Sequence, residues 1–192
     1  MTTTLEDRGT CVAIDTAYGR VVAAIFTDRA PITAGNFLRY VDAGHYQNAT
    51  FYRSARPDND ERLSKIRVIQ GGIDPTCRTA PFPPITHEST GMTALSHLDG
   101  ALSAVRWDPG SATSEFFIVI GDTPALDFGG DRNPDKQGYA VFGRVVRGMD
   151  IVRRISAIAT GTHATIEFMK NQAIIPPERM RIARLEHDAA AT

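Results

Sequence analysis

The sequence predicts a mainly β fold, either a closed barrel or a sandwich, formed by a single domain. Eight short runs of β-branched and aromatic residues recur along the chain, each bounded by Gly, Asp, Asn or Pro, as in strands joined by turns. Only two segments carry the spacing of an amphipathic helix. The 192 residues, 42% of them hydrophobic, are within the usual range for one domain with its own core.

The expected strands cover residues 11–15, 20–26, 49–55, 65–70, 101–106, 115–120, 139–146 and 180–185. Tyr18-Gly19 predicts a hairpin turn between the first two strands, and Asp99-Gly100 predicts a tight turn before the fifth.

Alternation along two of these strands sorts their side chains into two faces. Successive side chains of a strand point to opposite sides, so Phe116 faces the core while Glu115 and Phe117 face away from it. By the same rule Val68 and Gln70 share a face. An exposed aromatic and a polar amide on the non-core face indicate a binding site.

Two helices are expected, at residues 31–41 and 149–158. The first has Pro31 at an early helical position and stops at Gly44. The second places four aliphatic residues on one face and two arginines on the other. Amphipathic helices of this kind can close the open ends of a barrel.

Three irregular stretches separate these elements. Residues 56–64 form a charged loop, residues 73–92 are rich in Pro and Thr, and residues 128–138 are a Gly-, Asp- and Asn-rich insertion. Loops of this kind often border functional sites.

Charge and apolar runs predict the setting of the protein. A net charge of −1, without a long run of like charges, argues against nucleic acid as a partner. The longest apolar runs fall far short of the roughly 20 residues that span a bilayer, and residues 1–9 lack the apolar segment of a signal peptide. We therefore expect a soluble, cytoplasmic monomer with an N-terminal extension at 1–9, one domain at 10–187 and a frayed tail at 188–192.

Metal and cofactor chemistry is not indicated. Cys11 and Cys77 are the only cysteines and are expected to be free thiols. The five histidines lack metal-ligand spacing and are expected on the surface or in loops. The glycine pairs match neither a phosphate loop nor a dinucleotide fingerprint, so no cofactor is expected.

Hydrolytic chemistry is also disfavoured. Ser96-His97-Leu98-Asp99 contains the residue types of a triad, but a triad is defined by geometry and rarely by adjacency. Glu115 has no second carboxylate at an obvious partner position for acid–base catalysis.

Four motifs occur in order: Phe51-Tyr52-Arg53, Val68-Ile69-Gln70-Gly71-Gly72, Ser114-Glu115-Phe116-Phe117-Ile118 and Tyr139-Ala140-Val141-Phe142-Gly143. Together they strongly resemble the cyclophilins over residues 10–158, and most closely the bacterial branch. The resemblance implies a closed eight-stranded antiparallel β-barrel capped by two α-helices. It also implies peptidyl-prolyl cis-trans isomerase activity without a cofactor or metal.

The same resemblance implies roles for individual residues. Arg53 corresponds to the catalytic arginine, and Gln70 to its neighbour that grips the substrate backbone. The residues implied for the proline pocket, its rim and the flanking peptide are Val68, Phe117, Leu126, Tyr139, Val105 and Arg106.

Three positions depart from the family pattern. Arg67 and Ala125 stand where many cyclophilins carry aromatic residues, which predicts a reduced pocket wall and weak cyclosporin sensitivity. Glu115 stands where Gln is common. Its added negative charge is expected beside Arg53 or the pocket, where it either orients Arg106 or repels acidic peptides.

Two functions stay open for this fold. The first is an isomerase that acts on Xaa-Pro bonds of proline-containing peptides and unfolded proteins and assists folding. The second is a proline-peptide-binding module or chaperone with little turnover, in which Arg67 and Ala125 have eroded the pocket. A barrel that stores a small apolar ligand is less favoured, because its expected inner residues are bulky.

Overall fold

The computed structural model describes residues 10–73, 80–162 and 166–185. The strands are β1 (Thr10–Thr16), β2 (Gly19–Ile25), β3 (Ala49–Ala55), β4 (Val68–Gly72), β5 (Ala101–Ala104), β6 (Phe116–Val119), β7 (Ala140–Arg147), β8 (Thr160–Gly161) and β9 (Ala173–Arg184). The helices are α1 (Pro31–Asp42), α2 (Thr90–Thr93) and α3 (Met149–Ser156), with short 3-10 turns η2 (His45–Asn48), η3 (Pro124–Leu126) and η4 (Glu167–Met169). The expected extension and tail, and Cys77, lie outside the described residues.

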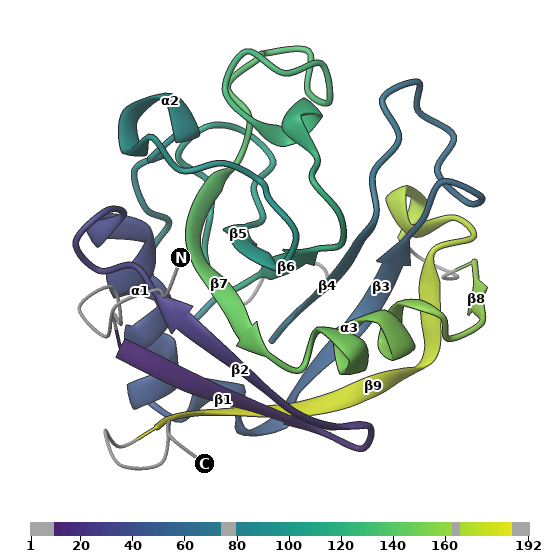
Figure 1. Cartoon of the computed structure of the whole chain (residues 1–192), viewed down its shortest axis with the longest axis horizontal. Helices are drawn as coiled ribbons and strands as arrows, with labels where there is room; N and C mark the ends of the chain where they lie inside the picture. Colours follow the sequence, from purple (N-terminus) through teal and green to yellow (C-terminus); the bar gives the residue numbers. More distant parts are fainter. Residues whose placement is uncertain (1–9, 74–79, 163–165, 186–192) are drawn as a thin grey trace, which may run out of the picture.

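Eight strands close into an antiparallel barrel (Figure 1). They pair in the order β1, β2, β7, β5, β6, β4, β3 and β9, and β9 pairs again with β1. The two-residue strand β8 lies outside this ring and pairs only with β9. This closure confirms the barrel and excludes the sandwich that the sequence also allowed.

The interior of the barrel is filled with large side chains. Phe116, from β6, lies at its centre and packs edge-on against Phe37 of α1, with ring centroids 5.4 Å apart. It also lies 6.1 Å from the rings of Tyr46 and Phe51. A core packed in this way leaves no interior space for a ligand among the described residues, so any binding site must lie on the outside of the wall.

The two expected helices are present, and a third appears. α1 begins at Pro31 as predicted, and Gly44 follows its end with a left-handed backbone, φ 73°. α1 and α3 both bury apolar side chains in the barrel core. α2 overlaps the end of the stretch 73–92 that was expected to be irregular, and its four residues are too few to show helical periodicity. Among the described residues, no helix is long and apolar enough to cross a membrane.

β9 is longer than its prediction at residues 180–185. Its first half contains Pro176 and Pro177, which argue against a strand because proline cannot donate to a ladder. Both prolines fall where the pairing with β3 shifts, between Glu178 opposite Phe51 and Ala173 opposite Arg53. No ladder hydrogen bond is needed from residues in this bulge, so the strand continues through it.

Removal of the central ring tests the filled interior. We expect Phe116→Ala to lower the free energy of unfolding by about 3 to 5 kcal/mol, because it leaves a cavity where three rings now meet. Urea unfolding measures the loss. Phe128→Ala is the matched control, since Phe128 is 53% exposed and should cost far less. Equal losses in the two variants would contradict a packed interior centred on Phe116.

Candidate active site

The site begins with an irregularity in β3. Phe51 pairs with Gly71 and Arg53 pairs with Gln70, so Tyr52 is an extra residue opposite β4. Without this bulge, Phe51 and Arg53 would share a face. With it, Phe51 fills the barrel core while the Arg53 side chain lies outside the wall.

A pocket of about 440 Å³ lies on the outer face of the wall beside Arg53. Eight of the nine residues expected in the site line it: Arg53, Val68, Gln70, Val105, Arg106, Phe117, Leu126 and Tyr139. The ninth, Glu115, is not part of the lining. Segments far apart in the sequence therefore meet at one cavity.

The floor of the pocket is apolar. Phe117, Val68 and Leu126 belong to a hydrophobic cluster on the outer face, separate from the barrel core. Phe117 meets the Tyr139 ring edge-on, with centroids 5.2 Å apart. The sequence placed Phe117 on the correct face but as an exposed ring. The structure corrects this, because its neighbours cover it to 5% exposure.

His97 supports Phe117 from below. The two rings stack with an interplanar angle of 14° and centroids 6.0 Å apart. His97 was expected on the surface, but it is buried, and burial lowers its pKa despite the hydrogen bond to Asp127. Its Nδ1 lies 2.6 Å from Asp127 Oδ1 and its Nε2 lies 2.9 Å from Ser103 Oγ.

The hydrogen bonds thus run from Ser103 to His97 to Asp127, in the order found in a hydrolase triad. Of the adjacent residues Ser96-His97-Leu98-Asp99 noted in the sequence, only His97 takes part. Ser103 has no exposed surface, so its hydroxyl cannot reach a substrate. The arrangement is a structural support for the pocket floor and leaves no path for nucleophilic attack.

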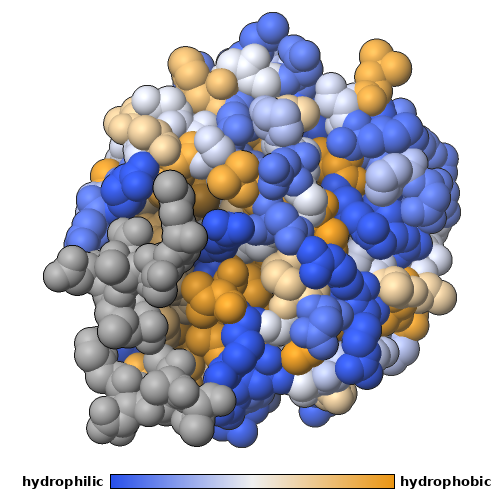
Figure 2. All heavy atoms as spheres, viewed as in Figure 1, coloured by the Kyte–Doolittle hydropathy of each residue, from blue (hydrophilic) through white to orange (hydrophobic). Residues whose placement is uncertain are grey.

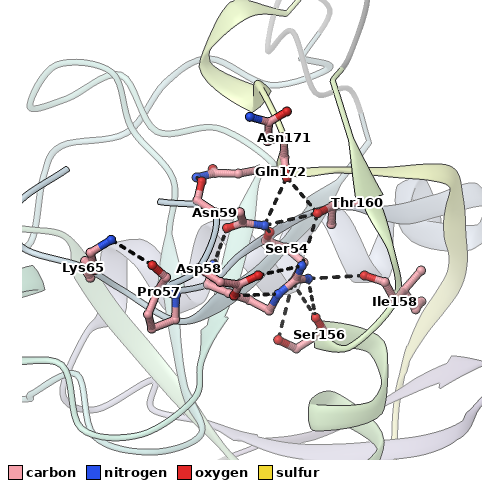
Figure 3. Close-up of polar contacts among 11 residues, drawn as sticks. Ser54, Pro57, Asp58, Asn59, Lys65, Ser156, Ile158, Thr160, Asn171 and Gln172 are labelled. Carbon is pink, nitrogen blue, oxygen red and sulfur yellow. Dashed lines mark hydrogen bonds and ion pairs between the residues drawn. The ribbon is translucent and has the colours of Figure 1, made fainter. Parts of the chain in front are cut away.

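Arg53 is fastened by two amide oxygens. Its Nη1 donates to Gln70 Oε1 at 2.7 Å, and its Nε donates to Gln172 Oε1 at 2.8 Å. Gln172 in turn donates to the backbone oxygen of Asn59. Figure 3 shows Asn59 and Gln172 in a polar network that also includes Thr160, near the end of α3. The guanidinium is therefore held at two points, by a residue of β4 and by the residue that precedes β9.

Behind Gln70, the hydrogen bonds continue to a buried carboxylate. Gln70 Nε2 donates to the Tyr52 hydroxyl at 2.9 Å, and that hydroxyl donates to Glu115 Oε2 at 2.6 Å. Glu115 Oε1 accepts from the backbone N–H of Ile73 at 2.8 Å. Any side chain at Gly72 would collide with this carboxylate. Glu115 thus acts on Arg53 through two intermediates, and it does not face the pocket.

Burial decides the charge state of Arg53. The pKa of its guanidinium is lowered to about 10, mainly by desolvation and also by the charge of Arg132, while Tyr139, Tyr52 and Asp60 oppose the shift. A pKa of about 10 still leaves the group protonated at neutral pH. The pocket therefore joins an apolar floor to a fixed cation.

The comparisons with known proteins agree with this arrangement. Residues 11–181 match the family described as cyclophilin type peptidyl-prolyl cis-trans isomerase/CLD. The chain belongs to the cyclophilins.

Relatives of known name support this membership. Peptidyl-prolyl cis-trans isomerase B of Escherichia coli is 36% identical over 78% of this chain and 86% of its own length. Peptidyl-prolyl cis-trans isomerase cyp18 of Streptomyces antibioticus is 34% identical over 79% of this chain and 86% of its own. The protein is accordingly a peptidyl-prolyl cis-trans isomerase.

A solved structure supports the fold. The crystal structure of a Cryptosporidium parvum cyclophilin type isomerase superposes with a TM-score of 0.71. It is 21% identical in sequence, and the match covers 93% of this chain and 98% of that one.

The departures from the cyclophilin pattern affect the pocket less directly than the sequence suggested. Arg67 is exposed, and neither it nor Ala125 is among the lining residues. Ile66 lines the pocket instead, from the position before Arg67. Weak cyclosporin sensitivity stays a prediction.

Several residues of the site carried no readable signal in the sequence. Gln172 and Arg132 lie far along the chain from Arg53 and match no motif. Tyr52 stood in a quoted motif, but alternation gives no sign that it is an extra residue opposite β4. Its hydroxyl lies between Gln70 and Glu115 in the folded chain. These residues come near Arg53 only through the tertiary fold, so no local pattern in the sequence marks them.

Removal of the Tyr52 hydroxyl tests the polar chain. We expect Tyr52→Phe to lower kcat/KM for prolyl isomerisation roughly tenfold, because Gln70 Nε2 and Glu115 each lose a partner and Arg53 is held less firmly. Exchange NMR on an Ala-Pro peptide measures the rate. Tyr18→Phe, at the β1–β2 turn, is the control and should match the wild type. Full activity in Tyr52→Phe would show that the chain does not position Arg53.

Proposed function

We propose that Arg53 accelerates rotation about Xaa-Pro bonds by hydrogen bonding to the prolyl amide while the apolar floor holds the proline ring. Rotation crosses a barrier of about 20 kcal/mol because the amide loses its resonance at the twisted midpoint. No bond breaks, so no nucleophile or cofactor is required. A donor that meets the amide more strongly in the twisted state lowers the barrier.

One observation carries this proposal: a half-buried, protonated guanidinium lies at the edge of an apolar floor in a single pocket. In this proposal Phe117, Val68 and Leu126 receive the proline ring, and Tyr139 closes the rim. Gln70 grips the substrate backbone in addition to holding Arg53. Val105 and Arg106 hold the flanking peptide.

The substrates in this proposal are proline-containing peptides and unfolded proteins whose folding the enzyme assists. A structure of the Cryptosporidium parvum cyclophilin was determined in the presence of the dipeptide Ala-Pro; it is 22% identical to this chain, with a TM-score of 0.71. The cytoplasmic location, the monomeric state, the lack of nucleic-acid or membrane partners and the domain bounds at 10–187 stay predictions from the sequence.

A binding module with little turnover is the second candidate, and the environment of Arg53 favours the enzyme. Its two amide contacts fix the guanidinium before a substrate arrives. Little entropy is then lost in ordering this side chain during the reaction. A module that only holds proline would need the floor without a fixed cation beside it.

Substitution of Arg53 separates the two candidates. A charge-assisted hydrogen bond is worth roughly 1.5 to 3 kcal/mol, so we expect Arg53→Ala to lower kcat about ten- to hundredfold with a smaller change in peptide Kd. Exchange NMR gives kcat and calorimetry gives Kd. Arg67→Ala, which removes an exposed arginine outside the pocket, is the control. A wild type that binds the peptide without acceleration would establish the binding module.

The pH profile tests the charge of Arg53. Because burial lowers its pKa to about 10, the cation is present below that pH and is lost as the pH rises through it. We expect kcat/KM to stay flat from about pH 7 to about pH 9 and to decline only above. Tyr139→Phe should keep this profile, and circular dichroism should show a folded protein throughout. A decline between pH 7 and pH 9 would assign the essential cation to another group.

A further inference from the structure

Two loops form the mouth of the proline pocket and are fastened to each other. In Figure 1 the β3–β4 connection and the β6–β7 connection both rise above the strands at the top of the view. Asp60 of the first and Arg132 of the second form an ion pair of 2.6 Å whose side chains are 2% and 3% exposed. Arg132 Nη1 also donates to the backbone oxygen of Ser64 at 2.8 Å.

The ion pair fixes the position of Arg132 at the pocket. Burial alone would raise the pKa of Asp60, but the hydrogen bond and charge of Arg132, together with backbone hydrogen bonds from Arg62 and Ile66, lower the pKa below its ordinary value. The carboxylate also accepts backbone N–H bonds from Ile66 and Arg62. Asp60 is therefore charged and held on several sides, and it ties Arg132 to the pocket wall.

The charges that face the pocket are mainly positive. The charged lining residues are Arg53, Arg62, Arg106, Arg132 and Lys170 on one side and Glu61 and Glu167 on the other. Asp60 and Asp135 are the partners of Arg132 and Arg106. Asp60 is buried beside Arg132, whereas Asp135 is 36% exposed, and neither carboxylate is part of the pocket lining.

Arg62 adds a cation without a carboxylate partner among the described residues. Its side chain is exposed, and its Nη1 makes a hydrogen bond of 3.4 Å to the backbone oxygen of Arg132. Figure 2 shows hydrophilic residues gathered over the β3–β4 connection at the upper right. Lys170 is different, because Glu61 lies 3.5 Å from it.

Two of these guanidinium groups affect each other. Both guanidinium groups line one cavity, where the charge of Arg132 lowers the pKa of Arg53 and the charge of its partner Asp60 raises it. An anion between them would be attracted by both and would relieve their repulsion. Glu115 does not oppose such an anion at the surface, since its carboxylate is buried behind Tyr52.

We propose that Arg62 and Arg132, with Arg53, form a subsite for an anionic group next to the substrate proline. The group is a carboxylate of Asp or Glu, or the phosphate of a phosphorylated serine. Arginine suits both, because its planar donors match their paired oxygens. The proposal rests on the proposed function, since it assumes that the apolar floor holds the proline.

Peptide pairs that differ in one charge test the subsite. The position before proline, and in a second series the position after it, carries Gln or Glu, and Ser or phosphoserine. We expect kcat/KM to be about tenfold higher for the anionic member in at least one series. The advantage should shrink as salt rises from about 0.05 M to about 0.5 M. The Glu and phosphoserine pairs distinguish the two sources of the anion. Equal rates within every pair overturn the subsite.

Variants of Arg62 and Arg132 then test whether these arginines cause the preference for anionic peptides. Arg62→Gln should reduce the advantage of the anionic peptide several-fold. Arg67→Gln removes an equal charge from an exposed position outside the lining, and it should leave the advantage intact. Arg132→Gln combined with Asp60→Asn removes the second guanidinium without leaving a buried charge unpaired. An advantage that survives both the Arg62 variant and the double variant overturns the assignment.

Failure of the subsite is distinguishable from failure of the proposed function. Acceleration of an Ala-Pro peptide tests isomerisation alone and involves no anionic group. If no peptide is accelerated, the mechanism fails, and the Kd of each Gln/Glu and Ser/phosphoserine pair measured by calorimetry still decides the subsite. Tighter binding of the anionic member supports it, and equal Kd values overturn it.

Discussion

A barrel whose interior is filled by side chains can bind a substrate only on its outer wall, and the rest of this structure follows from that constraint. Phe116 and Ile118 of β6 fill the inside, while Phe117 and Val119 point outward from the same strand. Because inward and outward side chains share one strand, the packing of the core also fixes the position of the pocket floor. A ligand meets side chains fixed by the packing behind them, as a preorganised site requires.

The same wall contains a chain of hydrogen-bonded polar side chains. Such groups can be buried beside an apolar core only if each of them has a hydrogen-bond partner. Glu115, Tyr52, Gln70 and Arg53 each donate to or accept from the next, so the buried carboxylate has partners on both oxygens. Such a network contributes little net stability, because desolvation offsets most of the attraction. What it supplies is geometry: the guanidinium has few alternatives to its observed orientation.

The sequence predicted the strands and faces that follow from local periodicity, and it missed the features that depend on tertiary contacts. The strand at 49–55 was predicted to the residue, and alternation placed Phe117 and Val68 on the outer face. Alternation could not reveal that Tyr52 is an extra residue, because the bulge there breaks the two-residue period. The first half of β9 was missed because its prolines are compatible with a strand only opposite that bulge.

Partners distant in the chain explain the remaining differences. His97 is flanked by loop residues, so its neighbours in the sequence give no sign that Ser103 and Asp127 bury it beneath Phe117. Arg132 lies in a Gly- and Asp-rich insertion of the kind usually exposed, and only its pairing with Asp60 reveals its burial. A sequence motif can identify residues that contact the substrate. The residues that position them can be identified only from the packing of the folded chain.

Strands and loops thus divide the pocket between them. The apolar floor and Arg53 are held by the barrel, where a substitution disturbs the core as well as the site. The mouth is formed by two connections whose sequence can vary with little effect on the wall. Loops of this length would sample many arrangements if they were independent. The buried Asp60–Arg132 pair links them, and because a lone partner would be an uncompensated buried charge, loss of either residue alone would cost more than loss of both.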